Sequence, residues 1–118
     1  MTGADSLAKL QADLRQFTDE RDWRQFHDPK SLILALVGEV GELAELFQWV
    51  PAGDARGEFS AGRRQERASE EMSDVLIYLL ALADVLDIDL LGSARQKLET
   101  SRRRFPVADV LGTAPHKD

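Results

Sequence analysis

Two apolar segments of this chain each carry a pair of carboxylates spaced three residues apart, and no other feature restricts the fold as strongly. The pairs are Glu39 and Glu42 in segment 31–49, and Glu71 and Asp74 in segment 70–86. Side chains three residues apart project from neighbouring points on one face of an α-helix. The spacing therefore predicts two apolar helices that each present two carboxylates from one face.

Bringing four carboxylates together between apolar helices costs free energy, because desolvation and mutual repulsion both oppose their ionisation. A bound cation or a strong hydrogen-bond network must offset that cost. Oxygen ligands, with no sulfur and no histidine inside either helix, favour Mg²⁺ or Mn²⁺ over zinc. Neither His27 nor His116 lies in the Glu-x-x-His motif expected of a di-iron bundle. We expect all four carboxylates to bind magnesium and to act in catalysis; the alternative is surface salt bridges with arginines.

Several other side chains are candidates for contact with a substrate, which we expect to be a polyphosphate because magnesium readily shares phosphate oxygens. Tyr78 follows Asp74 by one helical turn, so its hydroxyl can point toward the same site. Trp23 and Trp49 offer flat faces for stacking on a base. The alternative for each of these three residues is ordinary packing. His27 either contacts a base or caps the following helix, and Lys97 is either a point charge for a phosphate or a solvated surface residue.

Composition restricts the class of protein further. The chain has 118 residues, 43% hydrophobic residues, a formal net charge of −6 and no cysteine. This length suits one compact domain, and the lack of cysteine removes disulfides and thiolate chemistry. The negative charge argues against binding to nucleic-acid polymers or anionic membranes. No apolar run is long enough to span a membrane and no secretory signal is recognisable, so we expect a cytoplasmic protein.

Apolar periodicity predicts four helices and no strand. Ser6, Asp28 and Asp89 are expected N-caps, and Pro106 stops the last helix. The expected helices are one whose apolar stripe is Leu7, Leu10, Leu14 and Phe17, a second from about 29 to 49, a third from between 64 and 69 to about 86, and a fourth from 90 to about 104. We predict an all-α, four-helix domain over residues 1–106, followed by a tail, 107–118, that is mobile at its end.

The second and third predicted helices are apolar on more than one face. Such breadth implies packing against several neighbours, and a chain of 118 residues leaves part of this surface uncovered. We therefore expect a homo-oligomer. Residues 50–60 contain Pro51, Gly53 and Gly57 and form the clearest loop. This loop is expected to let the two helices run antiparallel and to lie near the mouth of their site.

The two carboxylate segments resemble a known family. EVGELAELFQW (39–49), followed by EEMSDVLIYLLALAD (70–84), closely resembles the MazG-like all-α nucleoside triphosphate pyrophosphohydrolases, and in particular their dCTP pyrophosphatase branch. RDWRQFHDPK (21–30) and KLETSRRRFPV (97–107) also match that branch. The resemblance covers about residues 10 to 107. It implies magnesium-dependent hydrolysis of a deoxynucleoside triphosphate to the monophosphate and pyrophosphate, as nucleotide-pool sanitation, by an oligomeric helical bundle.

The resemblance also implies roles for individual residues. Glu39, Glu42, Glu71 and Asp74 match the magnesium ligands, Trp23 and Trp49 match aromatic residues around the base, and Tyr78 and Lys97 match residues near the phosphates. His27, Ser101 and Arg102 lie in the matched segments and complete the candidate substrate-binding set. Two positions depart from the branch. Leu14 replaces a histidine that contacts the base, and Ser101 replaces an asparagine that precedes the final arginines.

Three functions remain open from the sequence. The leading one is cleavage of dCTP or a modified dCTP. The second keeps the chemistry but changes the base, to dUTP or another damaged nucleotide, because Leu14 removes a polar base contact. The third is a non-catalytic helical module whose apolar faces assemble partners. For the enzyme, the resemblance implies a homotetramer built as a dimer of dimers, with sites shared between chains.

Overall fold

The chain is helical throughout the part that the structure, a computed structural model, describes. That part is residues 6–114, and residues 1–5 and 115–118 lie outside it. The elements are α1 (Leu7–Glu20), the 3₁₀ turn η2 (Arg24–Phe26), α2 (Pro29–Phe47), α3 (Ala52–Glu58), α4 (Gly62–Val85), α5 (Leu90–Arg104) and α6 (Val107–Val110). No strand occurs between residues 6 and 114. The all-α prediction is confirmed.

Side-chain caps begin three of the helices at the predicted residues. The Oγ of Ser6 accepts a hydrogen bond from the backbone N–H of Lys9 at 3.0 Å. Asp28 accepts one from the N–H of Ser31 at 2.9 Å, and Asp89 accepts one from the N–H of Gly92 at 3.1 Å. Each bond satisfies an N–H group that has no partner inside its helix.

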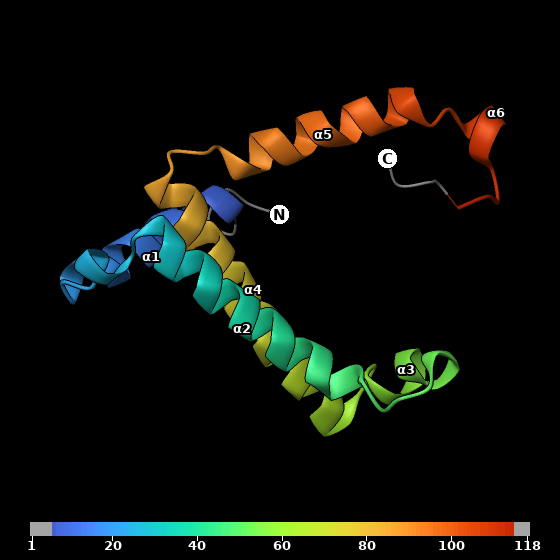
Figure 1. Ribbon diagram of the computed structural model, residues 1–118, viewed down its shortest axis with the longest axis horizontal. Helices are drawn as coiled ribbons and strands as arrows, with labels where there is room; N and C mark the ends of the chain where they lie inside the picture. Colours follow the sequence, from blue (N-terminus) through green and yellow to red (C-terminus); the bar gives the residue numbers. More distant parts are fainter. Residues whose placement is uncertain (1–5, 115–118) are drawn as a thin grey trace. The chain divides into compact units, whose positions relative to one another are not determined.

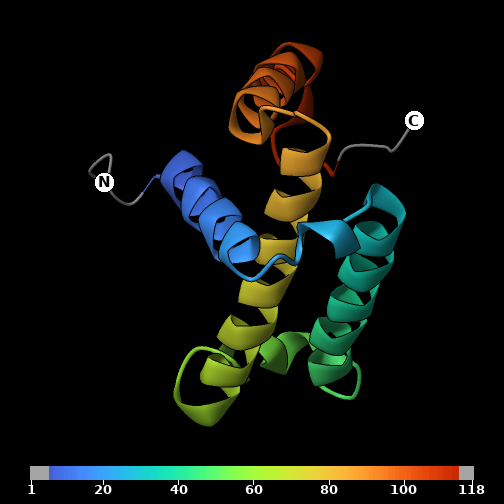
Figure 2. The same ribbon diagram turned by 90° about the vertical axis from the view of Figure 1, so that its left-hand side faces the viewer.

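Helices α2 and α4 lie side by side and run antiparallel, and they hold the core of the first part of the chain (Figures 1 and 2). Leu32 of α2 is 2% exposed and Leu80 of α4 is 1% exposed. The other buried apolar residues are Leu36, Ala68, Ala81 and Ala83. Helix α1 packs on α4, and Thr18 of α1 is buried. This pairing places the two carboxylate segments against each other.

The segment between the two carboxylate helices differs from the prediction. Residues 50–60 are expected to be a loop, but seven of them form α3 (Ala52–Glu58). Pro51 precedes the first turn, where its fixed φ suits helix entry, and Asp54 lies in that turn, where a carboxylate complements the helix dipole. The ring of Phe59 then stacks on Phe47 at 4.0 Å between centroids. Prolines and glycines therefore end α2 here without preventing a short helix.

Helix α4 begins earlier than expected, and η2 occupies part of the predicted connection. Gly62 opens α4 two residues before the earliest predicted start and has a φ of +69°, a conformation that glycine adopts without a Cβ clash. The polar segment before α2 contains one 3₁₀ turn, and Phe26 of that turn is 62% exposed. This large aromatic side chain is therefore not part of the core within this chain.

The chain divides into two compact units, residues 1–87 and 88–118. The second unit contains α5, which ends near Pro106 as predicted, and α6, which forms where the sequence predicts an irregular tail. Pro106 directly precedes α6, where proline is compatible with a new first turn. The predicted mobility of the chain's end concerns residues 115–118, which lie outside the described part.

Large apolar side chains remain exposed on α2 and α4. Leu34 and Val37 are each 60% exposed, and Met72 is 59% exposed. Leu10 and Phe17, of the apolar stripe predicted for the first helix, are also exposed. Further large apolar side chains that are exposed are Leu76, Leu86, Leu91 and Leu98. One pair of long helices does not bury more than a stripe of each. Among residues 6–114, no helix is both long enough and apolar enough to span a membrane.

Candidate active site

Three of the four predicted carboxylates meet between α2 and α4. Carboxylate oxygens of Glu39, Glu42 and Glu71 lie within 4.8 Å of one another. Glu39 and Glu42 share a face of α2 because they are three residues apart, and Glu71 of the antiparallel helix α4 lies opposite them. We call these three residues the carboxylate triad.

Two oxygens of the triad are buried and have no partner. The Oε2 atoms of Glu39 and Glu71 are shielded from solvent and accept no hydrogen bond from any described residue. Glu42 is exposed. A buried carboxylate oxygen without a donor loses its hydration without replacement. The triad therefore carries an unmet demand for positive charge or for hydrogen-bond donors.

The electrostatics of the triad follow from this burial. Loss of hydration raises the pKa of Glu39, and the negative charges of Glu42 and Asp74 raise it further. Burial also raises the pKa of Glu71, followed by its interactions with Glu42 and Asp74, while the positive charge of Arg67 opposes these effects. Both groups are easier to protonate than an ordinary carboxyl group, because their anions face each other's charge in a poorly hydrated place.

Asp74, the fourth predicted ligand, is not part of the triad. It lies three residues beyond Glu71 on α4 and is half-buried. Its charge reaches the triad, since it raises the pKa of Glu39 and of Glu71. Asp74 also lines a hollow beside the triad. It therefore lies where the triad and the hollow adjoin.

The donor set fits a hard divalent cation. It consists of carboxylate oxygens, two of them buried and unpartnered. A divalent ion would neutralise the repulsion that raises the two pKa values and would provide the missing partner for each orphaned oxygen. Exposed acidic clusters are common on protein surfaces, but buried oxygens without donors are not. The triad can therefore hold a metal ion.

The hollow beside the triad, which we call the aromatic hollow, has a volume of about 620 Å³, part of it open to solvent. Trp23, His27 and Tyr78 line it together with Asp74. Its other lining residues are Leu14, Phe17, Thr18, Ile77 and Ala81. The ring of Trp23 meets that of Phe17 edge to face, with 5.8 Å between centroids. The lining thus offers aromatic rings to a flat ligand, together with one carboxylate, Asp74, whose charge also acts on the triad.

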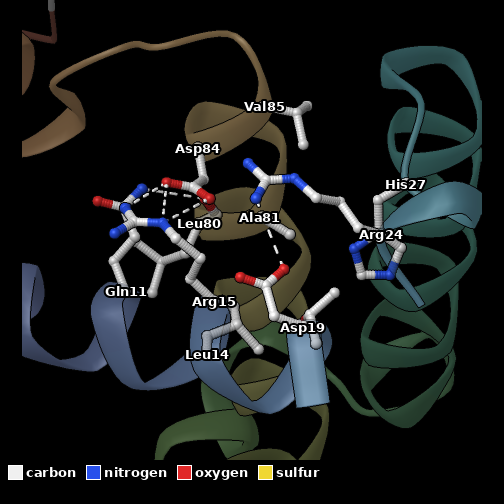
Figure 3. Close-up of a pocket in the computed structure, with 11 residues that line it drawn as sticks. Gln11, Leu14, Arg15, Asp19, Arg24, His27, Leu80, Ala81, Asp84 and Val85 are labelled. Carbon is white, nitrogen blue, oxygen red and sulfur yellow. Dashed lines mark hydrogen bonds and ion pairs between the residues drawn. The ribbon is translucent and has the colours of Figure 1, made fainter. Parts of the chain in front are cut away.

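A second hollow, of about 320 Å³, lies on the other side of Leu14, Thr18, His27 and Ala81, which line both hollows. We call it the charged hollow (Figure 3). Arg15 donates two hydrogen bonds from Nε and one from Nη2 to the carboxylate of Asp84. Arg24 extends toward Asp19, with 3.5 Å between Nη1 and Oδ1. These ion pairs are satisfied internally.

Trp49, another predicted substrate residue, does not line the aromatic hollow. Trp49 follows the C-terminal end of α2 and is 86% exposed, whereas Trp23 precedes its N-terminal end. Trp23 lines the aromatic hollow and Trp49 does not, so the two rings do not line one hollow within a single chain. Lys97, Ser101 and Arg102 belong to the second unit. Arg102 pairs with Glu99 at 2.8 Å there.

Three features of the site were not predicted from the sequence. The buried hydroxyl of Thr18 lines both hollows. The pair Arg15–Asp84 joins residues 69 positions apart, and no local pattern indicates such a contact. Arg67 lies four residues before Glu71, a spacing from which its influence on the triad could have been predicted.

Known proteins resemble this chain over most of its length. Residues 27–108 match the model of the MazG nucleotide pyrophosphohydrolase domain. The chain is 50% identical over 99 residues to dCTP pyrophosphatase 1 of Bos taurus, covering 84% of this chain and 59% of the relative. It is 52% identical over 91 residues to dCTP pyrophosphatase 1 of Homo sapiens, covering 77% of this chain and 54% of that protein. The chain thus spans less than two thirds of the length of these relatives.

A solved structure supports the same assignment. The structure of a pyrophosphatase from Archaeoglobus fulgidus superimposes with a TM-score of 0.76 at 40% sequence identity, covering 85% of this chain and 92% of that one. The family model spans more than half of the chain and includes the whole triad. The chain therefore belongs to the MazG nucleotide pyrophosphohydrolase family.

Proposed function

We propose that this protein hydrolyses a deoxynucleoside triphosphate, with dCTP or a modified dCTP favoured, to the monophosphate and pyrophosphate, and that it needs Mg²⁺ to do so. The observation that carries the proposal is the carboxylate triad, with its two unpartnered buried oxygens, directly beside the aromatic hollow. Relatives named dCTP pyrophosphatase 1 support the choice of substrate. Removal of altered nucleotides from the pool is the role that this activity suits.

In this proposal Glu39, Glu42, Glu71 and Asp74 hold the magnesium. When bound, the ion would neutralise phosphate oxygens and stabilise the charge that develops during phosphoryl transfer. Mn²⁺ could replace it, because the ligands are all carboxylate oxygens. Asp74 is suited to link the two parts of the site, since it lines the aromatic hollow and its charge acts on the triad.

The chain's own residues would bind and orient the substrate. The faces of Trp23 and the edge of His27 would hold the base in the aromatic hollow, and the hydroxyl of Tyr78 would lie one turn from Asp74. Glu42 is the exposed member of the triad, so it can orient a water molecule and accept its proton. The water oxygen bonds to phosphorus, the bridge between the α- and β-phosphates breaks, and pyrophosphate leaves.

We propose that the working form is a homo-oligomer, a dimer of dimers in which a second copy completes the site. Leu34 and Val37 of α2 and Met72 of α4 are each about 60% exposed, and burying such apolar side chains against a second copy would stabilise the assembly. Trp49 is 86% exposed and does not line the aromatic hollow of its own chain, and it could line that of a partner. Lys97, Ser101 and Arg102 remain candidates for phosphate or sugar contacts in that assembly.

One observation favours a different base as a second candidate. Leu14 lines the aromatic hollow and offers no hydrogen bond, so selection against bases other than cytosine depends on the remaining polar groups. A site that lacks a buried polar partner discriminates weakly between bases that differ in one polar group. Hydrolysis of dUTP or of a damaged nucleotide is therefore the alternative to dCTP.

The decisive experiment measures pyrophosphate release from a panel of natural and modified deoxynucleoside triphosphates, with and without Mg²⁺. We expect release from dCTP only with the metal. Glu42→Gln should lower kcat at least about 100-fold, whereas Glu45→Gln, a matched change one turn further along α2 and outside the triad, should retain activity. Retained helical circular dichroism shows that both variants fold. If no nucleotide is cleaved with magnesium present, the non-catalytic interaction module is the better reading.

A further inference from the structure

One face of α4 carries a line of four polar side chains, of which only three have a role above. Arg67, Glu71, Asp74 and Tyr78 follow one another at spacings of four, three and four residues. Such spacings keep side chains on a single helix face. Arg67 is therefore on the same face as the triad's glutamate and the two residues of the aromatic hollow.

The guanidinium of Arg67 is available to a ligand. Its side chain is exposed and forms no salt bridge or hydrogen bond with any residue of the range 6–114. Its neighbours are engaged elsewhere. Arg63 pairs with Glu66 at 3.5 Å, and Arg64 pairs with Glu58 and lies over the ring of Phe59. Arg67 is nevertheless close enough to Glu71 to lower the pKa of that carboxyl group.

The order of groups along α4 suggests what Arg67 binds. Tyr78 and Asp74 lie at the aromatic hollow, Glu71 lies in the triad, and Arg67 lies on the far side of Glu71. The backbone rise from Arg67 to Tyr78 is about 16 Å. A nucleotide with its base in the hollow and its α-phosphate at the triad would extend its outer phosphates toward Arg67. A guanidinium fits phosphate oxygens with two parallel N–H donors.

We propose that Arg67 is a substrate-binding residue that contacts the β- and γ-phosphates, the part that leaves as pyrophosphate. This inference rests on the proposed function, because it assumes the same base and triad positions. It assigns Arg67 to the leaving group and not to the base or the α-phosphate. Loss of the guanidinium should therefore weaken ligands that contain the outer phosphates and leave the monophosphate unaffected.

The test compares Arg67→Ala, Arg67→Lys and Arg63→Ala in the intact protein with magnesium. Arg67→Ala should raise the KM for dCTP and the inhibition constant of pyrophosphate about tenfold, the loss of one charge-assisted hydrogen bond, with kcat and the inhibition constant of dCMP nearly unchanged. Arg67→Lys should recover much of the loss. Arg63→Ala removes the same charge one turn nearer the N-terminal end of α4, from an arginine that pairs with Glu66, and should behave like the wild type.

A second readout separates substrate binding from a general effect of charge on the triad. Removing a cation near Glu71 should tighten Mg²⁺ binding to the nucleotide-free protein, while it weakens pyrophosphate binding. The inference is overturned if the KM for dCTP and the pyrophosphate constant of Arg67→Ala equal those of the wild type, or if dCMP weakens equally. If wild-type protein cleaves no nucleotide, the proposed function fails, and direct pyrophosphate binding with magnesium still decides the role of Arg67.

Discussion

Protonation of the triad should weaken its affinity for a metal ion. The number of protons released on binding should equal the number of triad carboxylates that are protonated beforehand. Glu39 and Glu71 have pKa values raised above the ordinary 4.5. A metal ion binds their ionised forms, so binding must release the protons they carry. Well above both raised pKa values no proton is released from them. Between the ordinary value and the raised ones, release should rise toward two protons per ion, one from each residue.

The assay is titration calorimetry of the nucleotide-free protein with Mg²⁺ or Mn²⁺ at a series of pH values, in buffers of different ionisation enthalpy. The slope of log affinity against pH equals the number of protons released, so it should approach two on the acid side and zero on the alkaline side. Glu39→Gln should limit the slope to one, because one of the two titrating groups is gone. The exposed control Glu45→Gln should retain the wild-type curve.

One result would refute this reasoning. If metal affinity stays constant as the pH falls from neutral toward 4.5, then Glu39 and Glu71 either do not ligate the ion or are not protonated more easily than ordinary carboxyl groups. A pH-dependent loss that Glu39→Gln leaves at its full slope would exclude Glu39 as a titrating ligand.

Other measurements test separate features of the molecule. Without metal, the raised pKa values of Glu39 and Glu71 stabilise the folded state below their ordinary 4.5, and this stability is lost as the pH rises through the folded values. Thermal unfolding at a series of pH values should show this pH dependence. Saturating Mg²⁺ should remove it. The hydrogen bond from Arg15 lowers the pKa of Asp84 below its ordinary 3.8, so the stability that this pair provides is present above 3.8 and is lost as the pH falls through the lower folded value. Asp84→Asn should reduce this loss of stability in acid. Trp23→Ala should raise the KM for dCTP roughly 5- to 150-fold, from a stacking energy of about 1–3 kcal/mol, without a matching fall in kcat. Leu80→Ala, at a side chain 1% exposed, should cost about 2–5 kcal/mol in urea unfolding; a loss below 1 kcal/mol would contradict its place in the core.

The sequence predicted those parts of the structure that depend on neighbours along the chain. The caps at Ser6, Asp28 and Asp89 follow from a side-chain oxygen three residues before a free N–H, and all three are formed. The spacing of Glu39 and Glu42 likewise places both on one face of α2. Composition was less informative for α3, because proline and glycine ended α2 but did not prevent a new helical turn.

The features that the sequence did not indicate depend on distance in space. The contact between Arg15 and Asp84 needs α1 to cross α4 at a particular level, and no local spacing records that level. The exposure of Met72 likewise depends on how many helices surround α4. Apolar periodicity gives the direction of a side chain relative to its own helix, but not which neighbour covers it.

The different positions of Trp23 and Trp49 connect the two open questions of the proposal, which base is bound and how the chain assembles. Two aromatic residues that both enclose one base must lie within a few ångströms of it, yet Trp23 lines the aromatic hollow and Trp49, 86% exposed, does not. Either Trp49 has no part in base binding, or it acts on the base held by another copy. The second alternative also explains why Leu34 and Val37, on the helix between them, are each 60% exposed, since the contact that brings Trp49 to a neighbouring hollow would bury the apolar face of α2. Base recognition and assembly would then depend on the same surface, so substitution of Val37 by a charged residue should impair both together.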